Sequence, residues 1–553
     1  MLARFDQRQL PGISRLYADF LYAPERLAGL FPAIPAFSPA ALRQYAAQGE
    51  LERRFPPRRR RQIVDLLAAS TPGSHAGAAA KNLESLSCPG AVAVVTGQQV
   101  GLFGGPLLTL YKALTAIRLA ADLRDAGCPA APVFWLASQD HDLEEVNQAW
   151  LTDGEGEARR IQAALPASAN GQPVGEIAFG EELEAALSEW EALAAPATSP
   201  AADAATAARP PLARLREAYH PGATFASAFA AALAEWFRPW GLLVLDPLAP
   251  GWAALALPLY LAAFDAAAGL RAALAERDRE IETRGYHVQV TQGDTASLLF
   301  LQDETHARRL LRRPAPGHGD RWLWGDEPIA ATELRRRLEA CPQRVSPAAL
   351  LRPLLQDALL PVLAQVSGPA ETAYLAQTAA LSPLLGIPAP IPWPRASLTF
   401  TDARARRLLE RYQLRLEDLF HQPAAELLAR ASLNPELETS LERLQTGLQA
   451  GLEDLLLQLE RHDPTLLDAA RTAAAKIRHQ SDQLAGRVAR SIARRNEELR
   501  RHAAHLAGWL TPRGQPQERV LNSAAVLARF PHFLERAYEA ITPLVADHLV
   551  LPL

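Results

Sequence analysis

The sequence is short of the residues that build metal sites and disulfide frameworks. Its 553 residues include 3 cysteines, Cys88, Cys128 and Cys341, each followed by proline and none in a CxxC pair. Their spacing argues against a zinc site and against the disulfide framework of a secreted protein. So few cysteines fit a reducing compartment, and we predict a cytoplasmic protein.

Long apolar runs and an excess of charge of one sign are also missing. The most apolar stretch, residues 241–264, is interrupted by an aspartate and three prolines, which makes it a poor membrane span. The N-terminal segment MLARFDQRQL carries charged and polar side chains where a signal peptide is apolar. The net charge is -4, and the one dense basic run, residues 53–61, is typical of a solvated surface. We predict neither a membrane nor a nucleic-acid partner.

Lysine is scarce as well. Only Lys81, Lys112 and Lys476 are lysine among the 57 basic residues. A lysine kept in an arginine-rich background can be needed for its compact ammonium group. Chance survival is the alternative for each of them.

Residues 91–138 carry the pattern of a βαβ unit. The β-branched apolar run at residues 91–97 predicts a buried strand, and residues 131–138 predict a second. Between them, residues 106–127 predict an amphipathic helix with proline in its first turn and glycine at its end. Short connections between these elements indicate an α/β fold with a parallel sheet.

Further elements extend this core. Residues 1–90 have helical periodicity, and residues 241–247 and 286–291 are further strand candidates. We expect two insertions, at about residues 154–240 and 305–344. The first contains an alanine- and proline-rich stretch that predicts a flexible loop.

The composition changes at about residue 396, where glycine and proline become scarce. Asp463 and Pro464 predict the start of a long helix that runs to about Leu510. Its apolar residues recur at intervals of four, seven or eight, which indicates a coiled-coil-like seam. We therefore predict a core at residues 1–395 and a helical arm at residues 396–553, built from antiparallel helices and suited to dimerisation.

The glycine-rich bend VVTGQQVGLFGGP, residues 94–106, lies between the first strand and its helix. Ligands of parallel sheets bind at this edge, and helix N-termini favour anions. The bend matches neither the Walker nor the GxGxxG pattern. A turn in which glycine permits close packing is the alternative. The candidate binding residues are Thr96, Gly97, Gln98, Gln99, Gly101, Phe103, Gly104 and Gly105.

A second polar cluster, SQDHDLEEVN, follows the second strand. Asp142 and Glu145 fit a helix capping box. We expect Asp140 and His141 to serve acid–base chemistry or to bind Mg²⁺, with Asp142 beside them.

A third polar cluster lies between residues 345 and 395. The stretch 345–377 has helical periodicity broken at Ser367-Gly368-Pro369, and its polar groups could line a pocket. A solvated helix face is the alternative. The candidates are Arg352, Gln356, Gly368, Glu371, Tyr374, Gln377 and Arg395.

Together these motifs resemble the bacillithiol-synthesis cysteine-adding enzyme family, BshC. The resemblance rests on TGQQVGLFGGP followed by YKA, on FWLASQDHDLEEVN, on LLRPLLQDALLPVLAQVSGPAETAYLAQ and on GIPAPIPWPR. The segment PRGQPQERVLN, residues 512–522, extends it, so it covers nearly the whole chain. Gln139 stands where much of the family has glutamate, and we assign it no catalytic role.

The resemblance implies a Rossmann-like, nucleotidyltransferase-type core with connecting-peptide-like insertions. It also implies a C-terminal coiled coil that pairs two subunits, with a C-terminal segment that returns to the core. The implied activity is a ligase reaction that adds cysteine to glucosaminyl-malate, the last step in making the low-molecular-weight thiol bacillithiol.

Chemistry constrains such a reaction. A free carboxylate does not acylate an amine in water, so we expect ATP to activate the cysteine carboxyl. We expect Mg²⁺ to bind together with ATP, and ADP is the alternative bound nucleotide. We expect the bend, with Gln98 as a catalytic group, to hold phosphate or the activated carboxylate. Asp140 and His141 would handle the amine. Arg352 and Arg395 would pair with the malate carboxylates, and Lys112 would support the cluster. No cysteine lies in these motifs, so we predict no thioester intermediate.

Three other functions stay open. One is a different amide- or adenylate-forming nucleotidyltransferase. Another is a non-catalytic, nucleotide-binding coiled-coil dimer, although dense polar clusters at strand ends speak against it. The third is a metal-dependent hydrolase that uses Asp140, His141 and Asp142, for which His287 and His306 are only distant further ligands.

Overall fold

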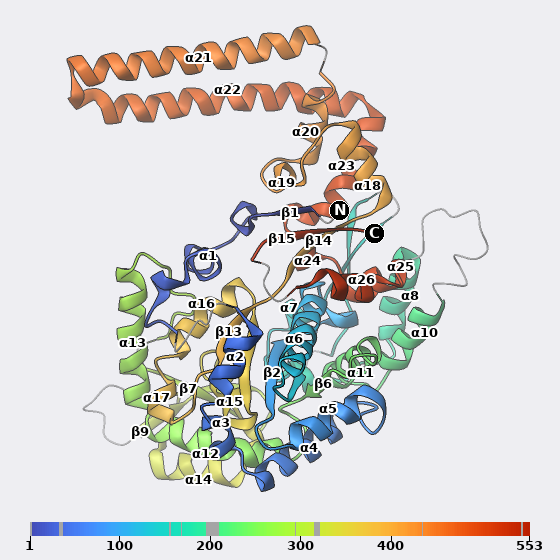
Figure 1. The fold of residues 1–553 in the computed structure, drawn as a ribbon, viewed down its shortest axis with the longest axis vertical. Helices are drawn as coiled ribbons and strands as arrows, with labels where there is room; N and C mark the ends of the chain where they lie inside the picture. Colours follow the sequence, from blue (N-terminus) through green and yellow to red (C-terminus); the bar gives the residue numbers. More distant parts are fainter. Residues whose placement is uncertain are drawn as a thin grey trace.

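A parallel five-stranded sheet forms the centre of the molecule (Figure 1). The computed structural model describes residues 3–31, 37–153, 156–166, 169–194, 209–293, 295–313, 321–433, 435–542 and 546–553. The strand order is β13-β12-β2-β3-β6, and every neighbouring pair is parallel. The strands are β2 (Val92–Gln98), β3 (Ala130–Leu136), β6 (Leu243–Leu245), β12 (Val362–Ser367) and β13 (Ile391–Pro394). The predicted α/β class is confirmed.

Helices cover both faces of this sheet, as the apolar character of its strands requires. Helix α6 (Leu108–Asp125) joins β2 to β3 and packs on one face, where Phe134 meets Leu110 and Leu114 in a common core. Helices α4 (Pro57–Ser70) and α5 (Gly77–Ser87) cover the other face. The crossover from β2 through α6 brings the carboxyl ends of β2 and β3 to one edge.

One predicted strand is absent, and one strand was not predicted. Residues 286–291 form no strand, because the backbone N–H and C=O of Val290 bond to the side-chain amide of Gln377 instead of to a neighbouring strand. Strand β12 lies within the stretch that has helical periodicity, directly after helix α15 (Arg352–Leu359). It is a central strand, between β13 and β2.

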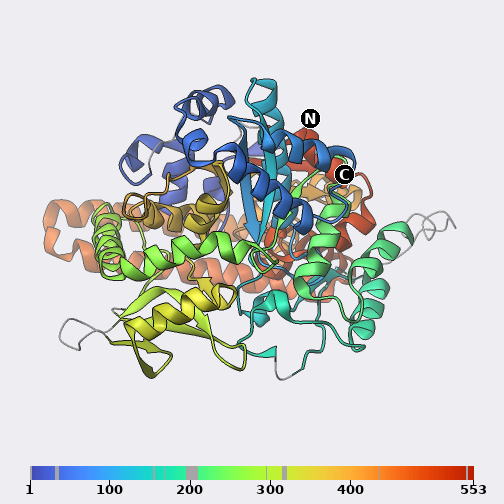
Figure 2. The same ribbon diagram turned by 90° about the horizontal axis from the view of Figure 1, so that it is seen from below.

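The two insertions fold into separate layers around the core, as Figure 2 shows. The first contains the hairpin β4 (Ala149–Thr152) and β5 (Ala158–Ile161) and the helices α8 (Leu183–Ala194), α10 (Arg209–Ala218) and α11 (Phe225–Trp236). Most of the alanine- and proline-rich stretch lies outside the described residues. The second insertion completes an antiparallel sheet, β10-β9-β8-β7-β11, from β7 (Ala296–Gln302), β8 (Arg308–Arg312), β9 (Arg321–Trp324), β10 (Glu327–Ala330) and β11 (Val345–Pro347).

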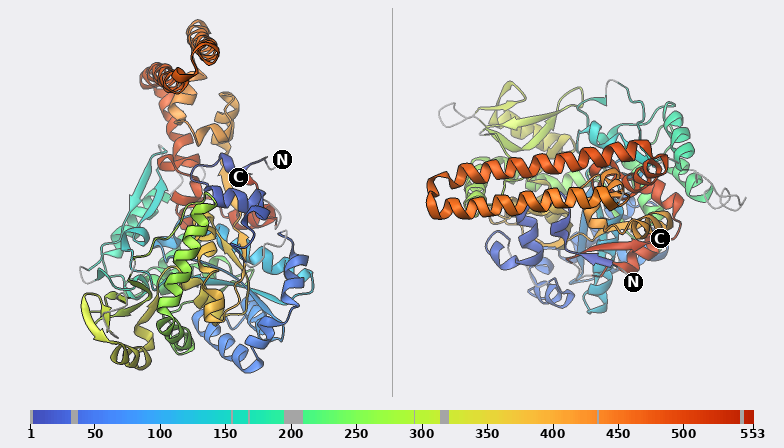
Figure 3. Two further views of the ribbon diagram at one scale, coloured as in Figure 1. Left: turned by 90° about the vertical axis from the view of Figure 1, so that its left-hand side faces the viewer. Right: turned by 90° about the horizontal axis from the view of Figure 1, so that it is seen from above.

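An antiparallel helix pair projects from the core, as Figures 1 and 3 show. Helix α21 (Pro435–His462) leads out and α22 (Leu467–Arg495) leads back. Asp463 caps the turn before α22, as expected. The single helix expected to run to about Leu510 is in fact two, because the side chain of Asn496 caps a new helix, α23 (Glu497–Leu510).

The end of the chain returns to the core. Strand β15 (His548–Pro552) lies between β1 (Ala3–Phe5) and β14 (Ser397–Thr401), so both chain ends share one small sheet. Helices α24 (Gln517–Val520), α25 (Ser523–Arg529) and α26 (Phe533–Ala540) link the arm to this strand. Over the described ranges no single helix is long and apolar enough to cross a membrane, although the bent pair Trp252–Asp265 and Ala267–Thr283 passes that test jointly.

Candidate functional site

A cavity of about 390 Å³ opens where β2, β3 and β12 end. Its size falls in the range of small-molecule sites, and the carboxyl edge of a parallel sheet is where such sites occur. Eleven of the residues expected to form a site line it: Gly97, Gln98, Gln99, Lys112, Asp140, Arg352, Gln356, Gly368, Glu371, Tyr374 and Arg395.

A continuous chain of hydrogen bonds runs along one wall of this cavity. The Lys112 ammonium donates to Glu371 Oε1 and to Gln98 Oε1, each at 2.7 Å. Gln98 Nε2 donates to Gln99 Oε1 at 2.8 Å. Gln99 Nε2 then donates to Glu145 Oε2 at 2.8 Å. We call this chain the relay; it connects three helices, α6, α7 (Leu143–Val146) and α16 (Pro369–Thr378), with the end of β2.

The two ends of the relay fix the orientation of both glutamine amides. An ammonium has only donors and a carboxylate only acceptors. Gln98 must therefore turn its carbonyl oxygen to Lys112, and Gln99 must turn its NH₂ to Glu145. The paired glutamines of the bend thus order the carboxylate of Glu145.

Lys112 uses all three of its ammonium donors. The third goes to the backbone carbonyl of Gly97 at 2.7 Å. The side chain is only 5% exposed, and this burial lowers the pKa of Lys112 although Glu371 opposes the effect. A guanidinium has a planar fork of donors and could not reach three partners arranged around one nitrogen. The geometry explains why lysine stands here.

Asp140 also lines the cavity, in a cationic setting. Its carboxylate accepts from the backbone N–H of His141 and lies 3.4 Å from Arg352 Nη2. Burial alone would raise the pKa of Asp140, but the bonds from His141 and the charges of Arg352 and Arg308 outweigh it and lower the pKa. Asp140 is therefore a weak base.

His141 Nδ1 lies 3.6 Å from Asp140 Oδ1 and also contacts Arg308 of the inserted sheet. Arg308 Nη1 lies 3.1 Å from His141 Nδ1, and since arginine can only donate, this nitrogen must be the acceptor. Arg308 also donates to Ser346 and stacks over the ring of Phe300. Burial lowers its pKa to about 10, which leaves it charged at neutral pH. His141 thus lies beside the site, and not among the lining residues.

The predicted cap is confirmed, and it sets the position of a further carboxylate. Asp142 accepts from the backbone N–H of Glu145 at 3.0 Å, at the start of α7 (Leu143–Val146). The side chain of Glu145 itself lines the cavity. Desolvation, together with the negative charges of Asp140 and Asp142, raises the pKa of Glu145.

The glycine-rich bend is a packing device more than a phosphate cradle, which corrects the expectation for its backbone. The N–H groups of Gly101, Gly104 and Gly105 donate to Gln99, Tyr219 and Leu102 inside the protein. A Cβ on Gly104 would lie 2.3 Å from the ring of Trp236, at a φ of +82°. These amides are not free to bind an anion.

Two other residues expected in the bend's site are structural. Thr96 donates its hydroxyl to the carbonyl of Val366, and so ties β2 to β12. Phe103 is fully buried, with its ring against those of Trp190 and Tyr219. Neither lines the cavity.

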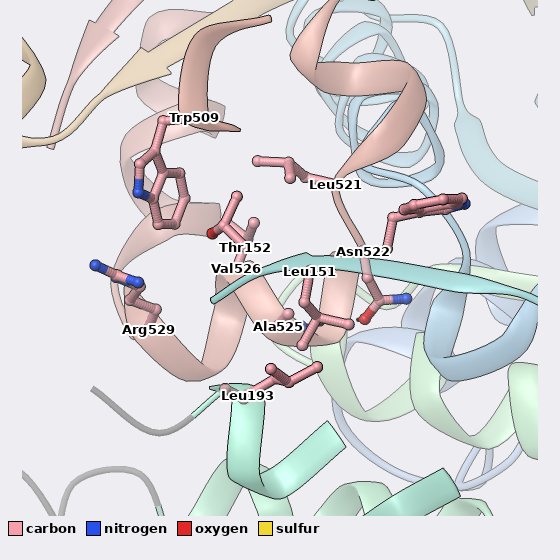
Figure 4. Close-up of a pocket in the computed structure, with 11 residues that line it drawn as sticks. Leu151, Thr152, Leu193, Trp509, Leu521, Asn522, Ala525, Val526 and Arg529 are labelled. Carbon is pink, nitrogen blue, oxygen red and sulfur yellow. Dashed lines mark hydrogen bonds between the residues drawn. The ribbon is translucent and has the colours of Figure 1, made fainter. Parts of the chain in front are cut away.

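Asn522 holds the bend from the C-terminal segment. Its Nδ2 lies 3.1 Å from the carbonyl oxygens of Leu102 and Phe103 and 3.3 Å from that of Gly105. Figure 4 shows Asn522 beside a small cavity of about 20 Å³ between the hairpin and α25. That volume holds about one water molecule, so it is a packing gap and not a substrate site.

Two residues of the third cluster also have internal roles. The amide of Gln377 bonds to Asp278 and to Val290. Arg395 forms a bidentate ion pair with Glu518, at 2.7 Å from Nη1 to Oε2 and 2.5 Å from Nη2 to Oε1, with both side chains at most 7% exposed. Burial would lower the pKa of Arg395, but Glu518 outweighs this and raises it. Arg395 is thus committed to Glu518, which corrects its expected role as a malate ligand.

A second cavity of about 280 Å³ adjoins the first. Both are lined by Gln98, Gln99, Leu108, Glu145 and Arg519. The second also takes in Gly101 and Gly105 of the bend, and residues 513–522 form one of its sides. The relay therefore lies at the junction of the two cavities.

Four residues at the site escaped the sequence analysis. Glu145 was assigned only to the helix cap, although its position after a buried strand was a usable signal. Arg308, Gln365 and Arg519 come from the inserted sheet, from the missed strand β12 and from the C-terminal segment. Arg519 belongs to the segment PRGQPQERVLN, but no local pattern places any of the three at the site, because only the fold brings them to this edge.

Among the described residues, no group of three histidine, cysteine, aspartate or glutamate side chains could hold a metal ion. The structure therefore gives no ligand set there for the hydrolase alternative. His287 and His306 do not join Asp140 and His141 in such a group.

Comparison with known proteins gives a consistent result over the whole chain. The model of the N-terminal Rossmann-like domain of bacillithiol biosynthesis BshC matches residues 4–396, and that of its C-terminal coiled-coil domain matches residues 398–553. A relative from Solibacter usitatus (strain Ellin6076) is 35% identical over 99% of this chain and 98% of its own. One from Koribacter versatilis (strain Ellin345) is 35% identical over 94% of both chains. Both relatives carry the name "Putative cysteine ligase BshC".

Proposed function

The chain belongs to the bacillithiol biosynthesis BshC family of ligases, and we propose that it joins the carboxyl group of cysteine to the amine of glucosaminyl-malate. The proposal includes activation of the cysteine carboxyl by a nucleotide before the amine attacks. It rests on the relatives' names for the reaction class and on the cavity for the chemistry.

The observation that carries the proposal is the meeting of opposite charges at one strand edge. Arg352 and Arg519 line the cavity together with Glu145 and Glu371. The two arginines can bind anionic substrates, and the two glutamates can bind or deprotonate a substrate amine. A scaffold that only binds a partner has no need of mutually ordered charges such as those of the relay.

The guanidinium groups suit the carboxylates of the malate moiety. Arg352 lends one donor to Asp140 at 3.4 Å, and its fork has five N–H groups in all. Arg519 lies where the two cavities join. We assign the malate carboxylates to these two residues and not to Arg395.

The activated intermediate requires ATP, with Mg²⁺ bound to its phosphates. The described residues offer no protein cluster for the ion, so Mg²⁺ would enter with the nucleotide. Gln98 and Gln99 would face the activated carboxyl, which requires donors near its developing oxyanion. The backbone of the bend takes no part in this assignment.

The arm supports a dimer in this proposal. Leu444, Ile477 and Leu484 are exposed on α21 and α22 at 42–48%, and they line an apolar groove with Leu448. Exposed leucine and isoleucine at one place on a helix pair are typical of an interface. Light scattering of the purified protein should give twice the mass of the 60.0 kDa chain, and replacing Ile477 and Leu484 by glutamate should give the monomer.

The activity is tested by competition among amino-acid donors. The purified protein is incubated with glucosaminyl-malate, ATP, Mg²⁺ and an equimolar mixture of amino acids, and the products are followed by mass spectrometry. We expect the cysteine amide alone. Preferential use of another amino acid would instead identify a different amide-forming nucleotidyltransferase.

A further inference from the structure

The junction of the two cavities places one carboxylate where the two substrates of a ligation would meet. The side chain of Glu145 lines both cavities, and the residue is exposed to solvent. An activated acyl group in one cavity and an amine in the other would approach each other at this wall. Proton removal from the amine has to occur at the same place.

We infer that Glu145 is the general base that takes the proton from the attacking amine. The inference rests on the proposed function and names a residue for its second step. Gln99 Nε2 donates to Glu145 Oε2, so the relay orients the carboxylate through one of its two oxygens. Within the described part of the chain, no hydrogen bond involves Oε1.

The other carboxylates of the cavity are engaged on both oxygens. Glu371 Oε1 accepts from Lys112, and its Oε2 accepts from the backbone N–H of Gly368 at 2.8 Å. Asp140 Oδ1 accepts from the backbone of His141, and Oδ2 faces Arg352. Neither has an oxygen as open to an incoming amine as Oε1 of Glu145.

The electrostatic setting favours the same residue. Desolvation and the neighbouring carboxylates raise the pKa of Glu145, whereas the pKa of Asp140 is lowered. A base with a pKa nearer to the working pH accepts a proton more readily. Asp140 and Asp142 are the negative charges near Glu145 and raise its pKa, whereas the positive charges of Lys112 and Arg352 lower it. Arg519 is a further positive charge in the lining of the cavity.

The ammonium group first loses one proton to solvent, and the free amine attacks the carbonyl carbon of a mixed carboxylic–phosphoric anhydride. The C–N bond forms, and the second proton of nitrogen passes to Glu145 Oε1. The C–O bond to phosphate then breaks, with the electron pair leaving on phosphate. Glu145 returns its proton to solvent.

The test compares Glu145→Gln with Glu144→Gln. Glutamine keeps an oxygen for Gln99 but cannot take a proton. Glu144 is an exposed carboxylate on the same helix that lines neither cavity, which makes it a matched control. We expect Glu145→Gln to lower kcat by about 10²–10⁴-fold, the usual contribution of a general base. Glu144→Gln should keep the wild-type rate.

Two further readouts separate a base from a structural role. The adduct of hydroxylamine with the activated cysteine has a much more acidic N–H than the adduct of an alkyl amine, so water can take its proton. Hydroxylamine capture should therefore proceed at nearly the same rate in wild type and Glu145→Gln. Glu145→Asp should recover part of the rate with amine and shift the acidic limb of the pH profile.

Failure of the proposed function and failure of the Glu145 assignment give different results. If wild-type protein forms no amide with any donor, the proposed function fails. If wild type is active and Glu145→Gln turns over at its rate, or loses hydroxylamine capture to the same extent as amide formation, the assignment of Glu145 is overturned.

Discussion

The buried pair of Arg395 and Glu518 allows a quantitative test of the structure against the role expected from sequence. Arg395→Met leaves the carboxylate of Glu518 buried without its partner. Breaking a buried pair in this way costs about 3–5 kcal/mol of unfolding free energy. Because the pair joins β13's end to α24, the loss should fall on the docking of the C-terminal segment. Replacing both residues by methionine should recover most of the loss, since apolar replacement of a whole pair is often neutral.

Chemical denaturation followed by far-ultraviolet circular dichroism measures this effect, with susceptibility to proteolysis as a second probe. Arg411→Met is the matched control. Its pair with Glu498 is about half exposed on both sides and should contribute at most about 1 kcal/mol. A folded Arg395→Met protein with wild-type stability and a KM for the malate substrate raised tenfold or more would refute the reasoning and restore Arg395 as a substrate ligand.

Three further predictions concern Lys112, Asn522 and His548. Lys112→Met removes the donor of Gln98 and Glu371, and should lower both kcat and unfolding free energy, with no rescue by Lys112→Arg; steady-state kinetics and denaturation check this. Asn522→Ala leaves the carbonyl of Phe103 without a donor, takes the second donor from those of Leu102 and Gly105, and removes the N-cap of α25. It should cost about 1–3 kcal/mol of unfolding free energy, measured by denaturation. Burial lowers the pKa of His548 from 6.5 to about 4, so the unfolded state binds the proton first as pH falls. Stability should therefore decrease between pH 6.5 and 4 by up to about 3 kcal/mol, and His548→Gln should flatten that part of the curve.

The βαβ unit could be predicted because its pattern is local. Residues 92–98 and 130–136 are short apolar runs, and the helix between them has proline and glycine at its ends. Strand β12 could not be separated from helix α15 by periodicity, since a short buried strand and a buried helical segment look alike. Pro361, just before the strand, was the available signal.

The candidate site could be located but not assembled from sequence. Its three motifs lie at strand ends, and eleven of the expected residues do line one cavity. What each side chain does depends on partners far along the chain. Arg395 forms an ion pair with Glu518, which is 123 residues away in the sequence. The side chain of Gln377 accepts the hydrogen bond from the Val290 N–H that a neighbouring strand would otherwise accept. The relay could not be predicted because its two ends come from different helices.

The most direct measurement follows the oxygen atoms of cysteine through the reaction. Cysteine whose carboxyl carries heavy oxygen is incubated with glucosaminyl-malate, ATP, Mg²⁺ and the protein, and both products are examined by mass spectrometry. Carboxyl activation predicts one heavy oxygen in the amide and one in AMP or phosphate, according to the intermediate. Amide formed without ATP, or with no heavy oxygen in any phosphate product, would contradict the account.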